Sequence, residues 1–278
     1  MIPAGRMLAS AALAGVLTGC VSYGAKSSYL AQFIAAERAG LPFEPMTDRR
    51  TRARFDDAYR AQRGYVRYRL RAGDTVAGYK GGLMSRGSLD ARNVTEPLVG
   101  TLFASGRAAD GATISLCGYR KASFELKLGY VMAASSRTSG DGGLTVLPVI
   151  DLPDIAYRDP DHYSAIDMAA ANVSAARYVL GAVRAAGQVD LDKVRVSLTL
   201  DGQPIASGMG GESLDGQRRS LSTLVALIRT TGRSARPGDL IVTGKMGDRG
   251  WLLPGRYAAD YGSFGTVRFT VVGCAVRQ

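Results

Sequence analysis

Few side chains in this 278-residue sequence are of the types that form catalytic or metal-binding sites. His162 is the only histidine, and its Asp-Pro-Asp-His-Tyr surroundings predict an exposed turn. A Ser-His-Asp or Cys-His catalytic unit is excluded unless His162 serves in it, and the cysteines and the histidine lack the spacing of a metal site. Charged side chains and hydroxyls remain as the candidates for chemistry.

Four charged residues lie in or beside apolar segments. Lys80 stands in Gly-Tyr-Lys-Gly-Gly, Glu125 and Lys127 share one apolar run, and Asp151 follows another. A lysine can donate or accept a proton, and carboxylates are ligands that hard divalent cations prefer. Taken one at a time, Lys80 is a solvated lysine in a turn, and Glu125 beside Lys127 is an ordinary strand pair.

The hydrophobic pattern predicts a helical N-terminal part followed by a region rich in strands. Apolar spacing predicts helices over 29–39 and 48–68, and the second of these has an arginine-rich polar face. Short apolar runs between glycine-containing turns predict strands over 111–117, 123–132, 145–150, 194–200, 240–243 and 266–272. The pattern also predicts a helix or helix pair over 164–185, a helix over 220–231 and a hairpin turn at Asp201-Gly202. With no internal repeat, the chain reads as one α+β domain.

Separated motifs along this pattern resemble a known family in their order and spacing. They are Asp57–Gln62, Gly73–Leu83, Phe124–Val131, Leu147–Asp154, Asp167–Ser174 and Arg236–Gly244, with closing strands over 262–272. Together they resemble the 2-oxopent-4-enoate hydratases and oxalocrotonate decarboxylases of the fumarylacetoacetate hydrolase superfamily. The resemblance covers 57–272 and implies a rolled mixed β-sheet with flanking helices and a helical N-terminal part.

The resemblance also implies roles for particular residues. In this family three carboxylates hold Mg²⁺ or Mn²⁺, which chelates a 2-oxo acid and polarises its carbonyl. Lys80 and Ser174 match catalytic positions, and Glu125 and Asp151 match two of the metal ligands. The implied ligand-binding residues are Glu125, Lys127, Asp151, Thr243 and Gly244.

The sequence departs from the family pattern around this pocket. Lys127 stands where the second metal glutamate is expected, and an ammonium cannot ligate a cation. We expect Lys127 to pair with Glu125 and Asp151, leaving either no metal or weakly bound Mg²⁺ or Mn²⁺. Three more positions differ: Leu98 replaces an acidic residue, Ala171 replaces an aspartate, and Gln217 falls where proline usually follows glycine.

These observations support two functions of different class. The chain is either a catalytically degenerate, metal-poor protein that retains a pocket for a small 2-oxo acid, which we favour, or an active hydratase, lyase or decarboxylase on such an acid. The losses at Lys127 and Leu98 favour the first, and Lys80 with the ordered motifs favours a surviving ligand site.

The N-terminus predicts export. Arg6 precedes a short apolar run, as in a signal peptide, and Leu17-Thr18-Gly19-Cys20 resembles the lipobox of bacterial lipoproteins. That resemblance implies a lipid on Cys20, and because Val21 is not aspartate it implies the periplasmic face of the outer membrane. We expect residues 1–19 to be the signal peptide, 20–47 a lipidated tether with an N-terminal helix, and 48–278 the fumarylacetoacetate-hydrolase-like domain.

Charge and cysteine content limit which partners and covalent bonds we expect. The formal charge is +11, and many arginines fall within 49–71, a face that suits anionic lipid headgroups or envelope polymers, or is simply solvated. We expect no nucleic-acid partner, because aromatic residues do not interleave with these arginines. Cys117 and Cys274 either form a disulfide or stay as two buried free thiols, and the sequence leaves open whether the chain forms a homo-oligomer.

Overall fold

The computed structural model describes residues 28–133, 144–187 and 189–274, so the predicted signal peptide and Cys20 lie outside the described residues. The helices are α1 (Tyr29–Ala39), α2 (Met46–Arg49), α3 (Phe55–Arg71), α4 (Arg86–Asp90), α5 (Ala165–Ala170) and α6 (Gln217–Thr230). The strands are β1 (Val76–Gly82), β2 (Leu98–Phe103), β3 (Arg107–Ala109), β4 (Thr113–Ser115), β5 (Ser123–Val131), β6 (Thr145–Leu152), β7 (Arg177–Leu180), β8 (Arg184–Ala185), β9 (Arg195–Leu200), β10 (Gln203–Met209), β11 (Leu240–Trp251), β12 (Gly255–Asp260) and β13 (Thr266–Val272).

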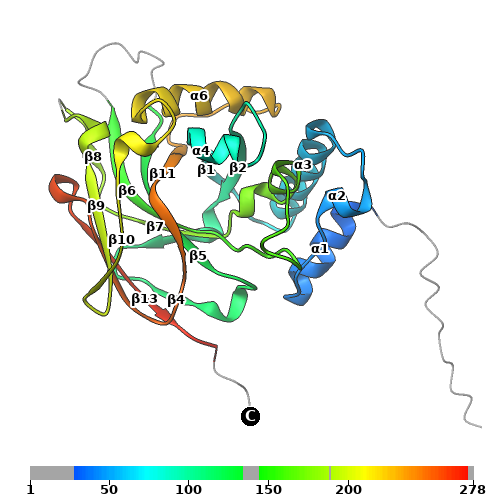
Figure 1. The fold of residues 1–278 in the computed structure, drawn as a ribbon, viewed down its shortest axis with the longest axis horizontal. Coiled ribbons are helices and arrows are strands. Elements are labelled where there is room, and N and C mark those ends of the chain that lie inside the picture. The colour runs from blue at the N-terminus through cyan, green and yellow to red at the C-terminus, as the bar shows by residue number, and fades with distance from the viewer. Residues whose placement is uncertain (1–27, 134–143, 188, 275–278) are drawn as a thin grey trace, which may run out of the picture.

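Two curved sheets pack around the main core. The larger sheet has the order β2-β1-β11-β5-β6-β7-β3, with β8 paired to β6, and the smaller has the order β10-β9-β12-β13-β4. Most neighbours are antiparallel, but β1 runs parallel to β11, β3 to β7, and β13 to β4. Figure 1 shows the strands curling into a roll, with α6 across one end and α1 to α3 to one side. This confirms the predicted α+β fold with a mixed sheet and flanking helices.

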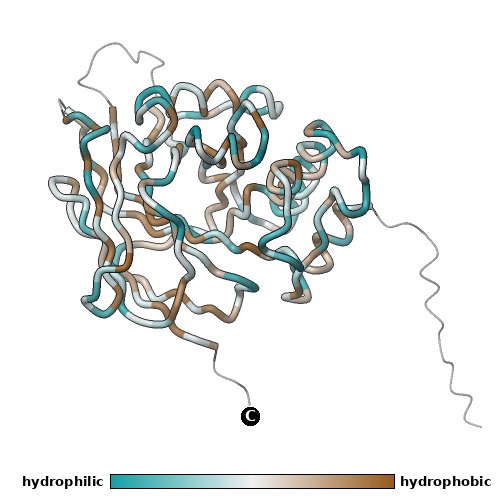
Figure 2. Tube along the Cα trace, viewed as in Figure 1, coloured by the Kyte–Doolittle hydropathy of each residue, from teal (hydrophilic) through white to brown (hydrophobic). Residues whose placement is uncertain are grey.

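Hydrophobic residues follow the strands, and hydrophilic ones follow the outer turns of the helices and loops (Figure 2). The predicted strands over 123–132, 145–150, 194–200 and 266–272 all form. The Asp201-Gly202 turn joins β9 to β10 with φ values of 50° and 84°, as a tight hairpin requires. β11 continues to Trp251, well beyond the predicted end at Thr243.

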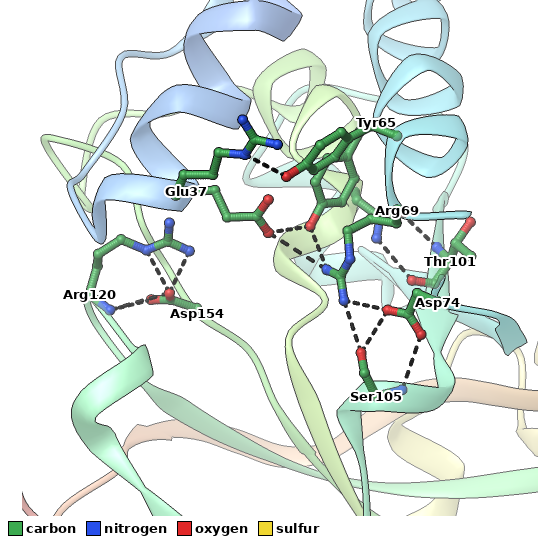
Figure 3. Close-up of polar contacts among 11 residues, drawn as sticks. Glu37, Tyr65, Arg69, Asp74, Thr101, Ser105, Arg120 and Asp154 are labelled. Atoms are coloured by element: carbon green, nitrogen blue, oxygen red, sulfur yellow. Dashed lines mark hydrogen bonds and ion pairs between the residues drawn. The ribbon is translucent and has the colours of Figure 1, made fainter. Parts of the chain in front are cut away.

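The N-terminal helices pack on the body of the domain. Phe33 of α1 lies edge-on against Phe43 and Tyr65 within a buried cluster. The helix predicted over 48–68 starts later, at Phe55, because the chain turns between α2 and α3 and Asp57 Oδ2 accepts a hydrogen bond from the Arg54 backbone N–H. At its other end Arg69 donates to Tyr65 Oη, Asp74 and Ser105 (Figure 3), which joins α3 to the loops around β1 and β2.

The prediction of helix over 164–185 was wrong beyond Ala170. After α5 the backbone of Asn172, Val173 and Ser174 takes positive φ values of 55°, 54° and 52°, and the chain then enters β7 and β8. The Asn172 amide accepts from Thr101 N at 2.7 Å and donates to Thr101 O at 2.9 Å. These tertiary bonds outweigh the helix propensity of the alanines, which is only a weak preference.

Cys117 and Cys274 form a disulfide, with 4.8 Å between their Cα atoms. Both residues are exposed, so the alternative of two buried thiols was wrong. The bond ties the 3₁₀ turn after β4 to the end of β13. In the part of the chain that the structure describes, no helix has both the length and the apolar character to cross a membrane.

Candidate active site

Four charged side chains meet on the inner face of the larger sheet. Lys80 comes from β1, Glu125 and Lys127 from β5, and Asp151 from β6. The antiparallel register of β5 and β6 sets Glu125 opposite Asp151, and β11 lies between β1 and β5. Lys80 Nζ lies 2.6 Å from Asp151 Oδ2, and Lys127 Nζ lies 3.0 Å from the same oxygen and 2.9 Å from Glu125 Oε2. The two ammonium groups and two carboxylates therefore form one buried charge cluster.

Burial and mutual charge set the protonation of this cluster. Burial acts to lower the pKa of Lys127, but the carboxylates of Asp151 and Glu125 outweigh it and raise that pKa above its ordinary value. For Lys80, burial prevails over the attraction of Asp151, and the nearby Lys127 charge adds to it, so its pKa is lowered. Burial opposes ionisation of Asp151 and Glu125, but the two lysines hold both of their pKa values below the usual range.

A cavity of about 560 Å³ opens above the cluster. Lys80, Glu125 and Lys127 form its floor, whereas Asp151 lies beneath them and does not line it. Asp151, expected to bind a ligand directly, contacts the two lysines and does not line this cavity. Asp151 Oδ1 has no hydrogen-bond partner among the described residues. Asp151 Oδ2 makes no hydrogen bond of good geometry either, but it forms two short ion pairs, one with each lysine.

The cavity wall carries further cations that no sequence motif marks. The Arg92 guanidinium lies over the Tyr163 ring, 4.3 Å from the ring centroid, and donates to the Tyr163 carbonyl oxygen. Arg249 donates to Tyr163 Oη at 3.3 Å, so one tyrosine positions both arginines. Lys245 also lines the wall, but its Nζ donates to Gly247 O. The excess of positive charge makes the cavity suited to an anion.

Ser174 is brought to the same cavity by the left-handed segment that begins at Asn172. Gly100 has no room for a side chain, because an added Cβ would lie 2.6 Å from Asn172 O. The close approach of β2 and the hydrogen bonds of Asn172 to Thr101 therefore hold this segment in place. A positive φ at three successive non-glycine residues is costly backbone, of the kind found at functional sites.

Two solved structures identify the architecture. A 4-oxalocrotonate decarboxylase from Pseudomonas putida G7, complexed with magnesium and adipate, aligns with a TM-score of 0.81 at 22% identity over 88% of this chain and 96% of that one. A yeast protein of the fumarylacetoacetate hydrolase family aligns with a TM-score of 0.50 at 15% identity over 72% of this chain and 96% of that one. The fold is that of the fumarylacetoacetate hydrolase family.

Sequence comparison finds hydratases and a decarboxylase among the similar proteins. A 2-keto-4-pentenoate hydratase from Paraburkholderia xenovorans LB400 is 29% identical over 227 residues, which cover 79% of this chain and 84% of the hydratase. A 4-oxalocrotonate decarboxylase from Pseudomonas sp. CF600 is 25% identical over 198 residues, covering 68% and 75% of the two chains. No family model matches the chain. The chain is thus similar in sequence to hydratases and a decarboxylase of the fumarylacetoacetate hydrolase superfamily.

The residues present do not fit a divalent cation such as the magnesium or calcium of the solved decarboxylase structures. The Lys127 ammonium occupies the space between the Glu125 and Asp151 carboxylates and takes up their negative charge at 2.9 and 3.0 Å. Among the residues that the structure describes, no cluster of three or more His, Cys, Asp or Glu side chains could hold a metal ion. The positive charge between these two carboxylates is an ammonium group.

Thr243 does not reach the cavity, in contrast to its predicted ligand-binding place. Its Oγ1 is fully buried and donates to Gln217 Oε1 at 2.8 Å and to Leu128 O at 3.2 Å. Gln217 also accepts from Tyr130 Oη and donates to Gly210 O, so the residue in the family's proline position joins α6 to β5 and β11. Gly244, the next residue, does line the cavity.

The other departures from the family pattern lie in the core. Leu98 is buried with Val173 and Ala170 and leaves no acidic group there. Ala171 is buried in the cluster of the N-terminal helices and faces a different cavity. His162 is exposed beside Asp159, as predicted, and takes no part in the site.

Proposed function

We propose that this chain is a hydratase or related lyase on a small 2-oxo acid, in which the Lys127 ammonium replaces the charge of a divalent cation. One observation carries the proposal: Lys127 lies between two carboxylates at the floor of a cavity that also contains Lys80, under a wall that carries Arg92 and Arg249. The hydratase and decarboxylase relatives support this class of chemistry.

The geometry assigns distinct tasks to these side chains. Arg92 and Arg249, held by Tyr163, bind the substrate carboxylate, because a guanidinium matches the two oxygens of a carboxylate. Lys80 removes or returns a proton at the carbon beside the carbonyl. When the proton is removed, the electron pair of the C–H bond moves into an enolate, and the Lys127 ammonium stabilises the negative charge on the enolate oxygen without rearrangement. Asp151 holds both lysines in place through its Oδ2 atom.

A direct assay tests the proposal. The purified chain, treated with EDTA, is given 2-keto-4-pentenoate, and loss of the substrate is followed by ultraviolet absorbance. We expect turnover in EDTA, its loss in Lys80→Met, and unchanged turnover in Lys193→Met, whose side chain is exposed and does not line the cavity. Turnover that appears only with added Mg²⁺ or Mn²⁺, or absence of both turnover and pyruvate binding, would contradict the proposal.

A second candidate is a binding protein without turnover, and the burial of Leu98 favours it. In this fold the family places an acid where Leu98 packs against the core, so one proton carrier is missing. Calorimetric titration with pyruvate separates the two candidates. Binding that Arg92→Gln weakens, with no conversion of any 2-oxo acid in the assay above, supports the binding protein.

We also propose that the chain is held at the periplasmic face of a membrane by a lipid on Cys20. The disulfide between Cys117 and Cys274 supports folding outside the cytoplasm, because thiols stay reduced inside it. We expect the Cys20→Ser variant to be absent from washed membranes. The Ser22→Ala variant, which keeps the Cys20 sulfur, should remain in them. Membrane retention of Cys20→Ser would refute the anchor.

A further inference from the structure

A second cavity, of about 880 Å³, lies between α3, the start of β1 and the segment that follows α6. None of its lining residues belongs to the cavity above Lys80 and Lys127. Its apolar surface comes from α3 and β1: Val66, Leu70, Val76 and Tyr79. We call it the arginine cleft because four arginines line it: Arg67 from α3, Arg229 from the last turn of α6, and Arg233 and Arg236 from the following segment.

The four arginines are not neutralised by the protein. Asp239 is the one carboxylate of the lining, and its Oδ2 accepts the Arg236 backbone N–H at 2.7 Å. Arg233 Nη1 donates to the neutral Thr101 Oγ1 at 2.5 Å. Within the described ranges, none of the four guanidinium groups forms an ion pair.

Arg69, two residues from Arg67 on the same helix, shows the opposite arrangement. It lies against Glu37, Asp74, Ser105 and Tyr65 (Figure 3). Arg69 of α3 is therefore paired with carboxylates, whereas Arg67 of the same helix, which lines the cleft, is not.

Like charges gathered in a concave, partly apolar space repel one another more than they do in open water. Burial lowers the pKa of the Arg233 guanidinium, and the charges of Arg63 and Arg67 lower it further, although Tyr79 opposes them. Asp239 can offset only part of the charge of the four arginines, so a bound anion would relieve the repulsion that remains.

We propose that the arginine cleft binds a multiply charged phosphate group. Planar guanidinium groups form paired hydrogen bonds with phosphate oxygens and are less strongly hydrated than ammonium groups, so they suit partly buried phosphate recognition. The apolar side chains beside them provide a surface for the organic part of the ligand. The phosphate comes either from a free pyrophosphate or organic phosphate, or from the headgroup of an anionic lipid.

Calorimetric titration of the full chain with inorganic pyrophosphate tests the site. Arg67→Gln/Arg236→Gln removes two exposed guanidiniums that make no side-chain bond, and Arg195→Gln/Arg219→Gln removes the same charge from exposed positions outside the cleft. We expect the first pair to weaken pyrophosphate binding by about tenfold or more and the second by less than about twofold, with unchanged circular dichroism melts. Equal losses in both, or no pyrophosphate binding by the wild type, would overturn the proposal.

A second arm identifies the source of the phosphate. Co-sedimentation compares vesicles of phosphatidylglycerol with vesicles of phosphatidylcholine, with and without pyrophosphate. Extra binding to phosphatidylglycerol that pyrophosphate displaces, and that the cleft variant loses, assigns the headgroup. Pyrophosphate binding without a difference between the vesicles assigns a free phosphate, and vesicle binding that pyrophosphate does not displace contradicts the cleft as the site.

Discussion

At the scale of single residues, the site depends on how two lysines share two carboxylates. A buried ion pair is a net cost unless its geometry is good, and one unpaired charge in such a cluster is severely destabilising. Lys127 is paired to both Glu125 and Asp151, and Lys80 to Asp151 alone. This inequality is why the pKa of Lys127 is raised while that of Lys80 is lowered.

Replacing the ammonium with a carboxylate should restore a metal site. Lys127→Glu adds a third carboxylate beside Glu125 and Asp151, and three carboxylates suit a hard dication far better than two beside an ammonium. We expect Mn²⁺ affinity, measured by calorimetry, to rise by about tenfold or more. The exposed Lys193→Glu is the control and should bind no more tightly than the wild type. Tight Mn²⁺ binding by the wild type would contradict the ammonium-substituted site.

Asp151 should make stability depend on acidity. Because its folded pKa is depressed, its contribution is complete above its unfolded value of 3.8 and is lost as the pH falls through the lower folded value. Asp151→Asn leaves two buried ammonium groups with less compensation and should lower the free energy of unfolding at pH 7 by about 3–5 kcal/mol. Urea unfolding across pH should also show a shallower acid slope in this variant, whereas the exposed Asp90→Asn should change neither quantity. An unchanged slope in Asp151→Asn would show that Asp151 does not account for it.

At the scale of elements, strand register assembles the floor of the cavity and one short segment completes its wall. The pairing of Glu125 with Asp151 and of Lys127 with Lys245 fixes where β5 meets β6 and β11. A shift of one residue in either pair would turn these charges to the opposite face. The left-handed run that carries Ser174 depends on β2, through the amide of Asn172.

Removing that amide should loosen the Ser174 segment. Asn172→Ala leaves the N–H and the carbonyl of Thr101 without their partner, at a cost of about 1–3 kcal/mol for each unsatisfied group. Ligand affinity should fall as well, because Ser174 is no longer held at the cavity. Asn93→Ala is the matched control, since Asn93 is exposed at a similar positive φ of 49°. Equal destabilisation of the two variants, measured by thermal melts, would assign the effect to backbone conformation alone.

At the scale of the whole molecule, a disulfide links two distant parts of the chain. Cys117 and Cys274 are separated by 157 positions, and their bond fastens the last strand of the smaller sheet beside its parallel neighbour β4. The bond thus encloses the part of the chain from β5 to β13 in one covalent loop. The N-terminal helices, by contrast, are held by packing of Phe33, Phe43 and Tyr65.

Removing this disulfide should destabilise the protein as a whole. Cys117→Ser/Cys274→Ser should lower the free energy of unfolding by about 2–5 kcal/mol, because a long loop in the unfolded chain is no longer constrained. Dithiothreitol should lower the melting temperature of the wild type and leave that of the double variant unchanged. Alkylation of both cysteines in unfolded, unreduced wild-type protein would show that the bond is absent.

The sequence by itself determined the fold class and the four charged residues of the cluster. Alternating and periodic apolar residues carry the information for individual strands and helices, which is why 29–39, 123–132 and 266–272 were predicted closely. The order of motifs then related Lys80 and Lys127 to one pocket although β1 and β5 are far apart in the chain.

Tertiary structure alone decided the rest of the site. Arg92 and Arg249 have no local pattern that marks them, and they meet only because Tyr163 lies between their segments. Thr243 turned away from the cavity because Gln217 of α6 offers it a buried acceptor. Hydrogen bonds between residues so distant in sequence form only after the sheets have curled together, so no window of sequence contains the information that places these side chains.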